Sequence, residues 1–394
     1  MSNGIERRPL PREIAFFSYG FRPFFLGGAL FAGVAIPAWI GILASTGNAA
    51  LLSTARDWHV HEMLFGFLPA VIAGFLLTAV PNWTDRPAVK GRELMLLFGV
   101  WGIGRVAMAL PTGLPLLTAL LDGAFLVCLA GVVWRELAAG KSWNQAPVGV
   151  VISCYACANL WFHLSAWSDA DTDRPFRMAL ALMMVLLTLI GGRLVPNFTR
   201  EFLGGEGRAE RPARFSHFDT VAIGLVTMAA VSWTVSPHAQ PTGWILLAAG
   251  VMQVARLLRW YGWLTWREPL VFVLHWGYGW VAAALLLLGC AIVGIGLSKE
   301  DAVHALTTGA IGVMTLGVMT RASLGHTGRP RHAGPATICM YSLVTVGALV
   351  RVFGLSTGLP PTLVLGVAAA EWSGAYLLFA LVYGPYLLRP SLDE

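Results

Sequence analysis

Residues 269–297 read PLVFVLHWGYGWVAAALLLLGCAIVGIGL, and they contain no aspartate, glutamate, lysine or arginine. A helix rises about 1.5 Å per residue, so this run is long enough to cross a hydrocarbon core of about 30 Å. Its apolar residues are continuous rather than alternating, which favours a transmembrane helix over a strand of an outer-membrane barrel. We therefore interpret the run as a membrane span, with the lipid bilayer as its partner.

The composition of the whole chain supports the same class of protein. Of its 394 residues 56% are hydrophobic and only 12% are charged, with a mean hydropathy of +0.67. A soluble domain carries about 25% charged residues, so an ordinary soluble enzyme and a disordered chain are both excluded. The net charge of +6 requires no nucleic-acid partner, because the cytoplasmic loops of membrane proteins are basic. The five cysteines lie in apolar stretches, which argues against a secreted disulfide framework.

The remaining apolar segments predict an all-α integral membrane protein with about twelve transmembrane helices in a single domain, 1–394. We expect the first run to be a retained span and not a signal peptide, because it lacks a small-residue cleavage site. The predicted spans are 24–44, 61–81, 93–111, 115–134, 148–167, 177–196, 218–236, 242–260, 269–297, 302–320, 334–354 and 361–388.

The basic residues predict the orientation of these spans. With the N-terminus inside, one basic residue, Arg105, lies within a span and 21 of the 27 fall on cytoplasmic segments. Such an asymmetry predicts a multi-pass protein of the bacterial inner membrane with both termini in the cytoplasm, residues 1–23 forming a cytoplasmic segment. Five basic residues remain on the outer side: Arg56, Arg174, Arg177, Lys299 and Arg351.

A short motif recurs at the ends of three predicted spans. Thr84 and Thr199 both follow a Val-Pro-Asn sequence, and Thr320 follows Val-Met. The threonines are 115 and 121 residues apart, or four spans, which predicts three parallel four-helix repeats at 24–140, 141–260 and 261–388. A helix stop that arose by chance at each place is the alternative.

Three histidines lie near the predicted outer boundary of different spans. His61 begins the second span, His163 lies near the end of the fifth, and His304 lies near the start of the tenth. The helical rise puts all three within about 5–6 Å of the outer boundary. Ligands from facing helices must share a depth to hold a metal or haem inside a bundle, so we interpret this layer as a metal site.

The segment Trp58-His59-Val60-His61-Glu62 adds a fourth histidine and a carboxyl. Positions i and i+2 of a helix point about 200° apart, so His59 and His61 cannot face one metal if both are helical. Either the helix begins after His59, or the two histidines serve different sites. Glu62, three residues after His59, would orient that imidazole or exchange protons with it.

Four further ionisable residues lie within predicted spans. His275 lies about 10 Å from the cytoplasmic side and is a candidate metal ligand, a proton-path residue or a structural histidine. Arg105 either pairs with Asp122 or contacts an anionic group such as a haem propionate. Glu371, near the middle of the last span, is a candidate catalytic carboxyl together with Glu62.

Several motifs resemble those of the NnrS family of bacterial membrane proteins. They are the sequences at 18–25, 58–67, 74–84, 256–260 and 304–329. The resemblance implies an inner-membrane protein of twelve spans that carries haem and copper. It also implies a role in denitrification and in resistance to nitric oxide and nitrosative stress.

A looser similarity links the chain to the haem–copper oxidases and nitric oxide reductases. Their catalytic subunits have twelve spans in three arcs and hold a haem between histidines on helices 2 and 10, where this chain has His61 and His304. The chain departs from them on helices 6 and 7, which carry no interior histidine; His217 lies only at the cytoplasmic edge of its span. A copper centre of the oxidase type is therefore in doubt.

From depth and spacing we expect His61 and His304, or one of the two, to bind one haem. We expect haem of b type, although depth and spacing do not themselves indicate the type. We expect His59 and His163 to help form a second metal site for copper, which accepts imidazole readily. The reverse assignment, with haem on His59 or His163 and copper on His61 or His304, stays open.

The sequence thus favours a haem- and copper-binding protein that handles nitric oxide or another small diatomic ligand. An oxidoreductase that acts on nitric oxide, with an electron donor that the sequence leaves unknown, is the favoured activity. A proton-coupled secondary transporter is the first alternative, since twelve spans and Glu371 also suit that class. A haem- or copper-delivery protein is the second.

Overall fold

The computed structural model describes residues 15–45, 49–110, 113–168 and 170–392, and its regular elements there are all helical. The first fourteen residues of the predicted cytoplasmic segment 1–23 lie outside that part. The main helices are α1 (Phe21–Ser45), α2 (Ala49–His61), α3 (Leu68–Thr84), α4 (Gly91–Ala109), α5 (Pro115–Ala139), α6 (Ala146–Trp167), α7 (Asp173–Gly205), α8 (His217–Val235), α9 (Gln240–Leu258), α10 (Pro269–Val293), α11 (Lys299–His304), α12 (Val313–Gly325), α13 (Pro335–Phe353) and α14 (Pro361–Leu388). Short 3₁₀ turns lie at Ala15–Phe17, Trp143–Gln145, Gly262–Thr265 and Leu355–Thr357.

The helices confirm the predicted fold class, an all-α integral membrane protein. Within the described ranges, eleven helical stretches are long and apolar enough to cross a membrane. The predicted span at 93–111 corresponds to α4, which has 19 residues and is not one of the eleven. Its charged residues Arg92, Glu93 and Arg105 lower its hydropathy. Arg105 is nevertheless buried.

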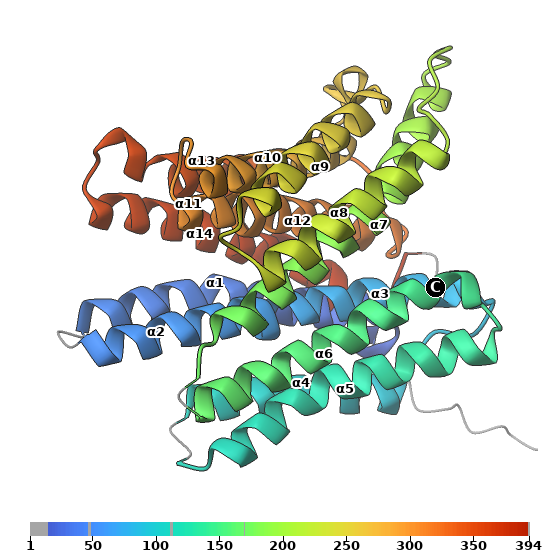
Figure 1. Ribbon diagram of the computed structural model, residues 1–394. Coiled ribbons are helices and arrows are strands. Elements are labelled where there is room, and N and C mark those ends of the chain that lie inside the picture. Colours follow the sequence, from blue (N-terminus) through green and yellow to red (C-terminus); the bar gives the residue numbers. More distant parts are fainter. Residues whose placement is uncertain (1–14, 46–48, 111–112, 169, 393–394) are drawn as a thin grey trace, which may run out of the picture.

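The long helices lie side by side, with α4 to α6 on one side of α1 and α3 and with α7 to α10 on the other (Figure 1). Helix α1 packs against α3 and α14, whereas α10 packs against α7, α9 and α12. Helices α11 to α14 complete the bundle beside α10 (Figure 1). The three parallel repeats remain a prediction, because pairwise packing alone does not establish them.

Proline marks many of the helix starts and is also tolerated inside four helices. Helices α5, α6, α9, α10, α13 and α14 have proline in their first turn, where its missing N–H would be unpaired in any case. Pro37, Pro81, Pro196 and Pro385 lie within helices. Neighbouring helices compensate such breaks in a membrane bundle. The prolines in the first turns fix where six helices begin, which explains why the predicted spans there agree closely with the observed helices.

The second span differs most from its prediction. Its helix begins at Ala49 rather than at His61, so both His59 and His61 are helical. It continues through a π-helical segment, η2 (Glu62–Phe67), into α3. The described residues hold one other π-helical segment, η5 (Ala305–Gly312), which directly follows His304. Such segments are rare and frequently lie at functional sites, so they mark His61 and His304, the residues directly before them, as candidate functional residues.

The cytoplasmic placement of both termini remains a prediction from the basic residues. Reporter fusions after residues 140, 205 and 330 should be active only with a reporter that works in the cytoplasm. The reason is that 21 of the 27 basic residues lie on the segments assigned to that side. Activity of a periplasmic reporter at any two of these positions would overturn the orientation.

Candidate functional site

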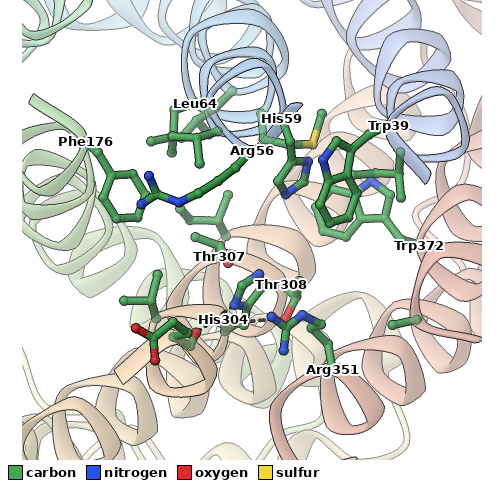
Figure 2. A pocket seen from close by; sticks show the side chains of 18 of the residues that line it. Trp39, Arg56, His59, Leu64, Phe176, His304, Thr307, Thr308, Arg351 and Trp372 are labelled. Carbon is green, nitrogen blue, oxygen red and sulfur yellow. Dashed lines mark hydrogen bonds between the residues drawn. The ribbon is translucent and has the colours of Figure 1, made fainter. Parts of the chain in front are cut away.

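The two histidines of α2 face different neighbours. His61 contacts His163 of α6, with the two Nε2 atoms 3.2 Å apart. His59 instead lines a pocket that His304 of α11 also lines (Figure 2). The structure thus brings His61 together with His163 and His59 together with His304, rather than His61 with His304, and which of these histidines bind haem stays a prediction. The cause is the turn of about 200° between positions i and i+2, which applies because the helix already includes His59.

The first pair belongs to a buried group of donor atoms. Asp122 Oδ2, on α5, lies 2.8 Å from His163 Nε2 and 3.2 Å from His61 Nε2. Ligands bonded at about 2.0–2.1 Å to one tetrahedral metal ion lie about 3.3 Å from one another. The ring nitrogens of His61 and His163 and this carboxylate oxygen already have nearly that spacing. Within the described chain they form the group of residues that could hold a metal ion.

The hydrogen bonds around His61 leave its Nε2 atom facing other acceptors. Glu62 Oε1 accepts a hydrogen bond from His61 Nδ1 at 2.9 Å, which leaves the lone pair of a neutral ring on Nε2. Asn159 donates its amide N–H to Asp122 Oδ2 and so presents its own oxygen to His61 Nε2, at 3.1 Å. An electron-rich atom among acceptors requires a proton or a metal cation. The Glu62–His61 pair also matches the carboxylate–histidine pairing that orients metal ligands.

The charges of this group also favour a bound cation. Arg105 donates to both oxygens of Glu62, at 2.7 and 2.6 Å, and forms an ion pair with Asp122. One positive charge therefore faces two negative charges, and the group has a net charge of −1 when both imidazoles are neutral. All of its charged side chains are buried, where an unbalanced charge is costly. One monovalent cation, or one proton, would balance it.

The second pair lies in a pocket with a volume of about 420 Å³. Figure 2 shows His59 and His304 on different helices with their rings directed into the same space. The His59 ring stacks on Trp39, with centroids 4.1 Å apart and planes inclined by 20°. His304 Nδ1 donates to the carbonyl oxygen of Glu300 at 2.7 Å, so Nε2 keeps its lone pair. The Nε2 atom of His304 is thus available to coordinate a metal.

The lining of the pocket combines features that suit a planar tetrapyrrole with an iron at its centre. Its volume lies in the range of about 300–1,000 Å³ that is typical of small-molecule sites. Two imidazoles on different helices suit the axial positions of haem iron. The indole Nε1 of Trp39 is buried without a hydrogen-bond partner, so a pocket ligand would meet an unused donor there. The rest of the wall is largely apolar and includes Phe67 and Trp372.

The structure places the other predicted site residues elsewhere. Arg105 is held by Glu62 and Asp122 and does not line the pocket, so it is not available for a propionate there. Glu62 was expected to orient His59, but it instead accepts a hydrogen bond from His61, beside which the segment η2 begins. The predicted pairing of Arg105 with Asp122 is confirmed.

His275 and Glu371 belong to neither group. His275 is buried on α10, with Nε2 2.7 Å from Thr199 Oγ1 and Nδ1 unpaired. Glu371 is half-buried on α14, packs against Gly347, and forms no ion pair within the described residues. Both remain predictions, of a metal ligand and of a proton-transfer carboxyl.

Sequence reasoning missed several residues of these two sites. Asp122 was recognised only as a partner of Arg105, although it also contacts both histidines of the first group. Asn159 shares a helix face with His163 because it lies four residues before it, and that spacing was the available signal. Trp39 had no signal, since a lone tryptophan near the end of a span is common.

A glycine beside the first group provides a test of its packing. A Cβ at Gly66 would overlap the guanidinium of Arg105 and lie 3.0 Å from the ring of Phe31. Arg105 cannot move away easily because two carboxylates hold it. We expect Gly66→Ala to destabilise the protein by about 1–3 kcal/mol, the usual cost of overpacking.

The control for this substitution is Gly102→Ala on α4, where a Cβ would meet nothing within 4 Å. That change should be neutral or slightly stabilising, because alanine favours a helix over glycine. Thermal unfolding in detergent measures both variants. Equal melting temperatures for the two would contradict the packing described here.

Together, the fold and these sites define a class: an all-α, multi-pass membrane protein with a buried histidine–aspartate group suited to a metal ion. The family model described as NnrS protein matches residues 15–391, so the chain belongs to the NnrS family. No curated protein matches the chain. Membership of this family suggests a membrane protein related to nitric oxide.

Proposed function

We propose that this protein binds haem and copper in the bacterial inner membrane and handles nitric oxide. One observation carries the proposal. The four histidines of the outer layer are divided into two facing pairs by a single helix, His59 with His304 on one side and His61 with His163 on the other. Two separate histidine sites suit two different cofactors.

Haem is assigned to the pocket. His59 and His304 would hold its iron, and apolar side chains of the lining such as Phe67 and Trp372 would contact the tetrapyrrole. The chemistry that haem supplies is direct binding of a diatomic molecule such as nitric oxide at the iron. The protein's own contribution is to orient the two imidazoles, the second of which is fixed by the Glu300 carbonyl.

Copper is assigned to the buried group of His61, His163 and Asp122. Imidazole nitrogen is a good ligand for copper in both oxidation states. Glu62 holds the Nδ1 proton of His61 and so keeps Nε2 directed at the ion. Cu(I) would also supply the single positive charge that the group lacks, given its one arginine and two carboxylates.

The favoured activity is that of an oxidoreductase, in which nitric oxide is reduced with electrons from a separate donor. Glu62 touches a proposed copper ligand and is the first candidate for moving a proton at that site. Glu371 lies outside both sites and is proposed as a proton-transfer carboxyl of α14. A delivery protein for haem or copper would use the same two sites without turnover.

The test is a visible spectrum of the purified protein, before and after anaerobic addition of nitric oxide, combined with metal analysis. We expect a Soret band that shifts on addition of nitric oxide, and copper bound together with haem. Consumption of nitric oxide with a supplied electron donor would favour an enzyme over a delivery protein. Absence of both cofactors from protein expressed with haem and copper would refute the proposal and favour a transporter.

A further inference from the structure

The cations around the pocket have an unusual origin. The outer side of the chain is predicted to carry five basic residues, and four of them line this one pocket: Arg56 of α2, Arg177 of α7, Lys299 of α11 and Arg351 of α13. The same wall contains two acids, Asp173 and Glu300. Two further acids, Asp57 and Asp301, form ion pairs with Arg56 and Arg351, so the acids around the pocket equal its four lining cations in number. Basic residues are otherwise sparse on this side, so their concentration here requires a reason.

The acids do not neutralise these cations equally. Arg56 and Arg177 share Asp173, at 2.7 and 3.7 Å. Lys299 has no carboxylate partner in the described chain; its Nζ contacts the neutral acceptor His238 Nδ1 at 2.9 Å.

Arg351 is the cation nearest the proposed haem ligands. One of its nitrogens donates to Asp301 at 2.8 Å, and the guanidinium lies beside His304 and Thr308 (Figure 2). A guanidinium has five N–H donors, so a single carboxylate partner leaves others for a ligand. Lys299 and Arg351 are therefore the cations best placed to receive a further anion.

We infer that Lys299 and Arg351 bind carboxylates of the pocket's occupant. This inference rests on the proposed function, in which the occupant is haem. Haem carries two propionates, and Lys299 and Arg351 are two cations that keep N–H donors not used by a carboxylate. Phe67 and Trp372 belong to the apolar part of the same lining, where they would contact the apolar part of the tetrapyrrole. Charge-assisted hydrogen bonds of this kind are stronger than neutral ones.

The test compares iron protoporphyrin IX with its dimethyl ester, in which both carboxylates are neutral. The full-length protein, purified without haem in detergent, is titrated with each compound and followed by its Soret band. We expect the wild type to bind the free acid at least about tenfold more tightly than the ester, a ratio equivalent to about 1.4 kcal/mol. Lys299→Gln and Arg351→Gln should each reduce binding of the free acid and leave binding of the ester unchanged.

Arg174→Gln is the matched control, because Arg174 is the one outer basic residue that does not line the pocket. It should leave both affinities unchanged. Lys299→Gln is the safer of the two test variants, because it leaves no carboxylate without a partner. Arg351→Gln removes the ion-pair partner of Asp301.

Each outcome decides a different question. If the acid and the ester bind the wild type equally, haem binding stands and the carboxylate inference is wrong. If the variants lose both compounds to the same degree, the two cations have a structural role and the inference is again wrong. If neither compound produces a Soret band, haem is not the occupant, and the proposed function and the inference both fall.

Discussion

Alanine at His163 is expected to remove copper from the protein while leaving haem in place. His163 Nε2 lies 3.2 Å from His61 Nε2 and 2.8 Å from Asp122 Oδ2, so its loss opens the triangle of proposed ligands. Even substitution of residues that only orient metal ligands costs about 10–100-fold in affinity, and loss of a ligand should cost more. His61→Ala should have the same effect. Metal analysis together with the visible spectrum of the same samples measures both results.

Two further variants sharpen this prediction. Asp122→Asn removes the anionic ligand and one of the two negative charges that face Arg105, so it should weaken copper binding strongly with little change in volume. His275→Ala is the control, because His275 is also a buried histidine but contacts Thr199 and belongs to neither site. Full copper content in both His61→Ala and His163→Ala would refute the copper site proposed at the buried group around Asp122. The copper would then bind elsewhere in the chain.

Substitution of His59 or His304 is expected to have the opposite outcome, loss or shift of the Soret band with copper retained. Both side chains line the 420 Å³ pocket, and neither belongs to the buried group around Asp122. Loss of one axial imidazole changes the coordination of the iron, and loss of both should leave it without a protein ligand there. Optical spectra of the reduced and oxidised forms of each single variant and of the double variant test this result.

The comparison of His59→Ala with His61→Ala is the decisive one, because the two residues are separated by a single valine. The proposed assignment predicts that the first loses haem and the second loses copper. If His61→Ala lost the haem band and His59→Ala kept it, the original expectation of a haem between His61 and His304 would be restored. Identical losses in both variants would instead indicate a general failure to fold.

The elements of the bundle were largely predictable. Long apolar runs can satisfy their backbone in lipid only as helices, so segments such as 269–297 define spans without knowledge of their neighbours. Depth was predictable for the same reason, since helical rise converts sequence position into height. That argument placed His61, His163 and His304 in one layer, and the structure shows that histidines of this layer do meet. The partnership of Arg105 with Asp122 also followed from burial of two opposite charges.

The partners within that layer were not predictable. Height along a helix says nothing of the direction in which a side chain points, and direction depends on where the helix begins. Because α2 begins at Ala49, His59 and His61 are both helical and face opposite neighbours. Glu62 begins the π-helical segment η2 and contacts His61, and no residue pattern in the sequence predicts this segment.

The sequence alone therefore determined the class of the protein and most of its spans, and it predicts a level for the histidines, since these follow from hydrophobicity and helical rise along one chain. Only the tertiary structure decided that His61 faces His163 and Asp122, and that His59 shares a pocket with His304 and four outer cations. The physical reason is that such partnerships depend on the rotation of each helix and on which helices pack beside it. Both are set by the packing of the whole bundle and not by any one segment.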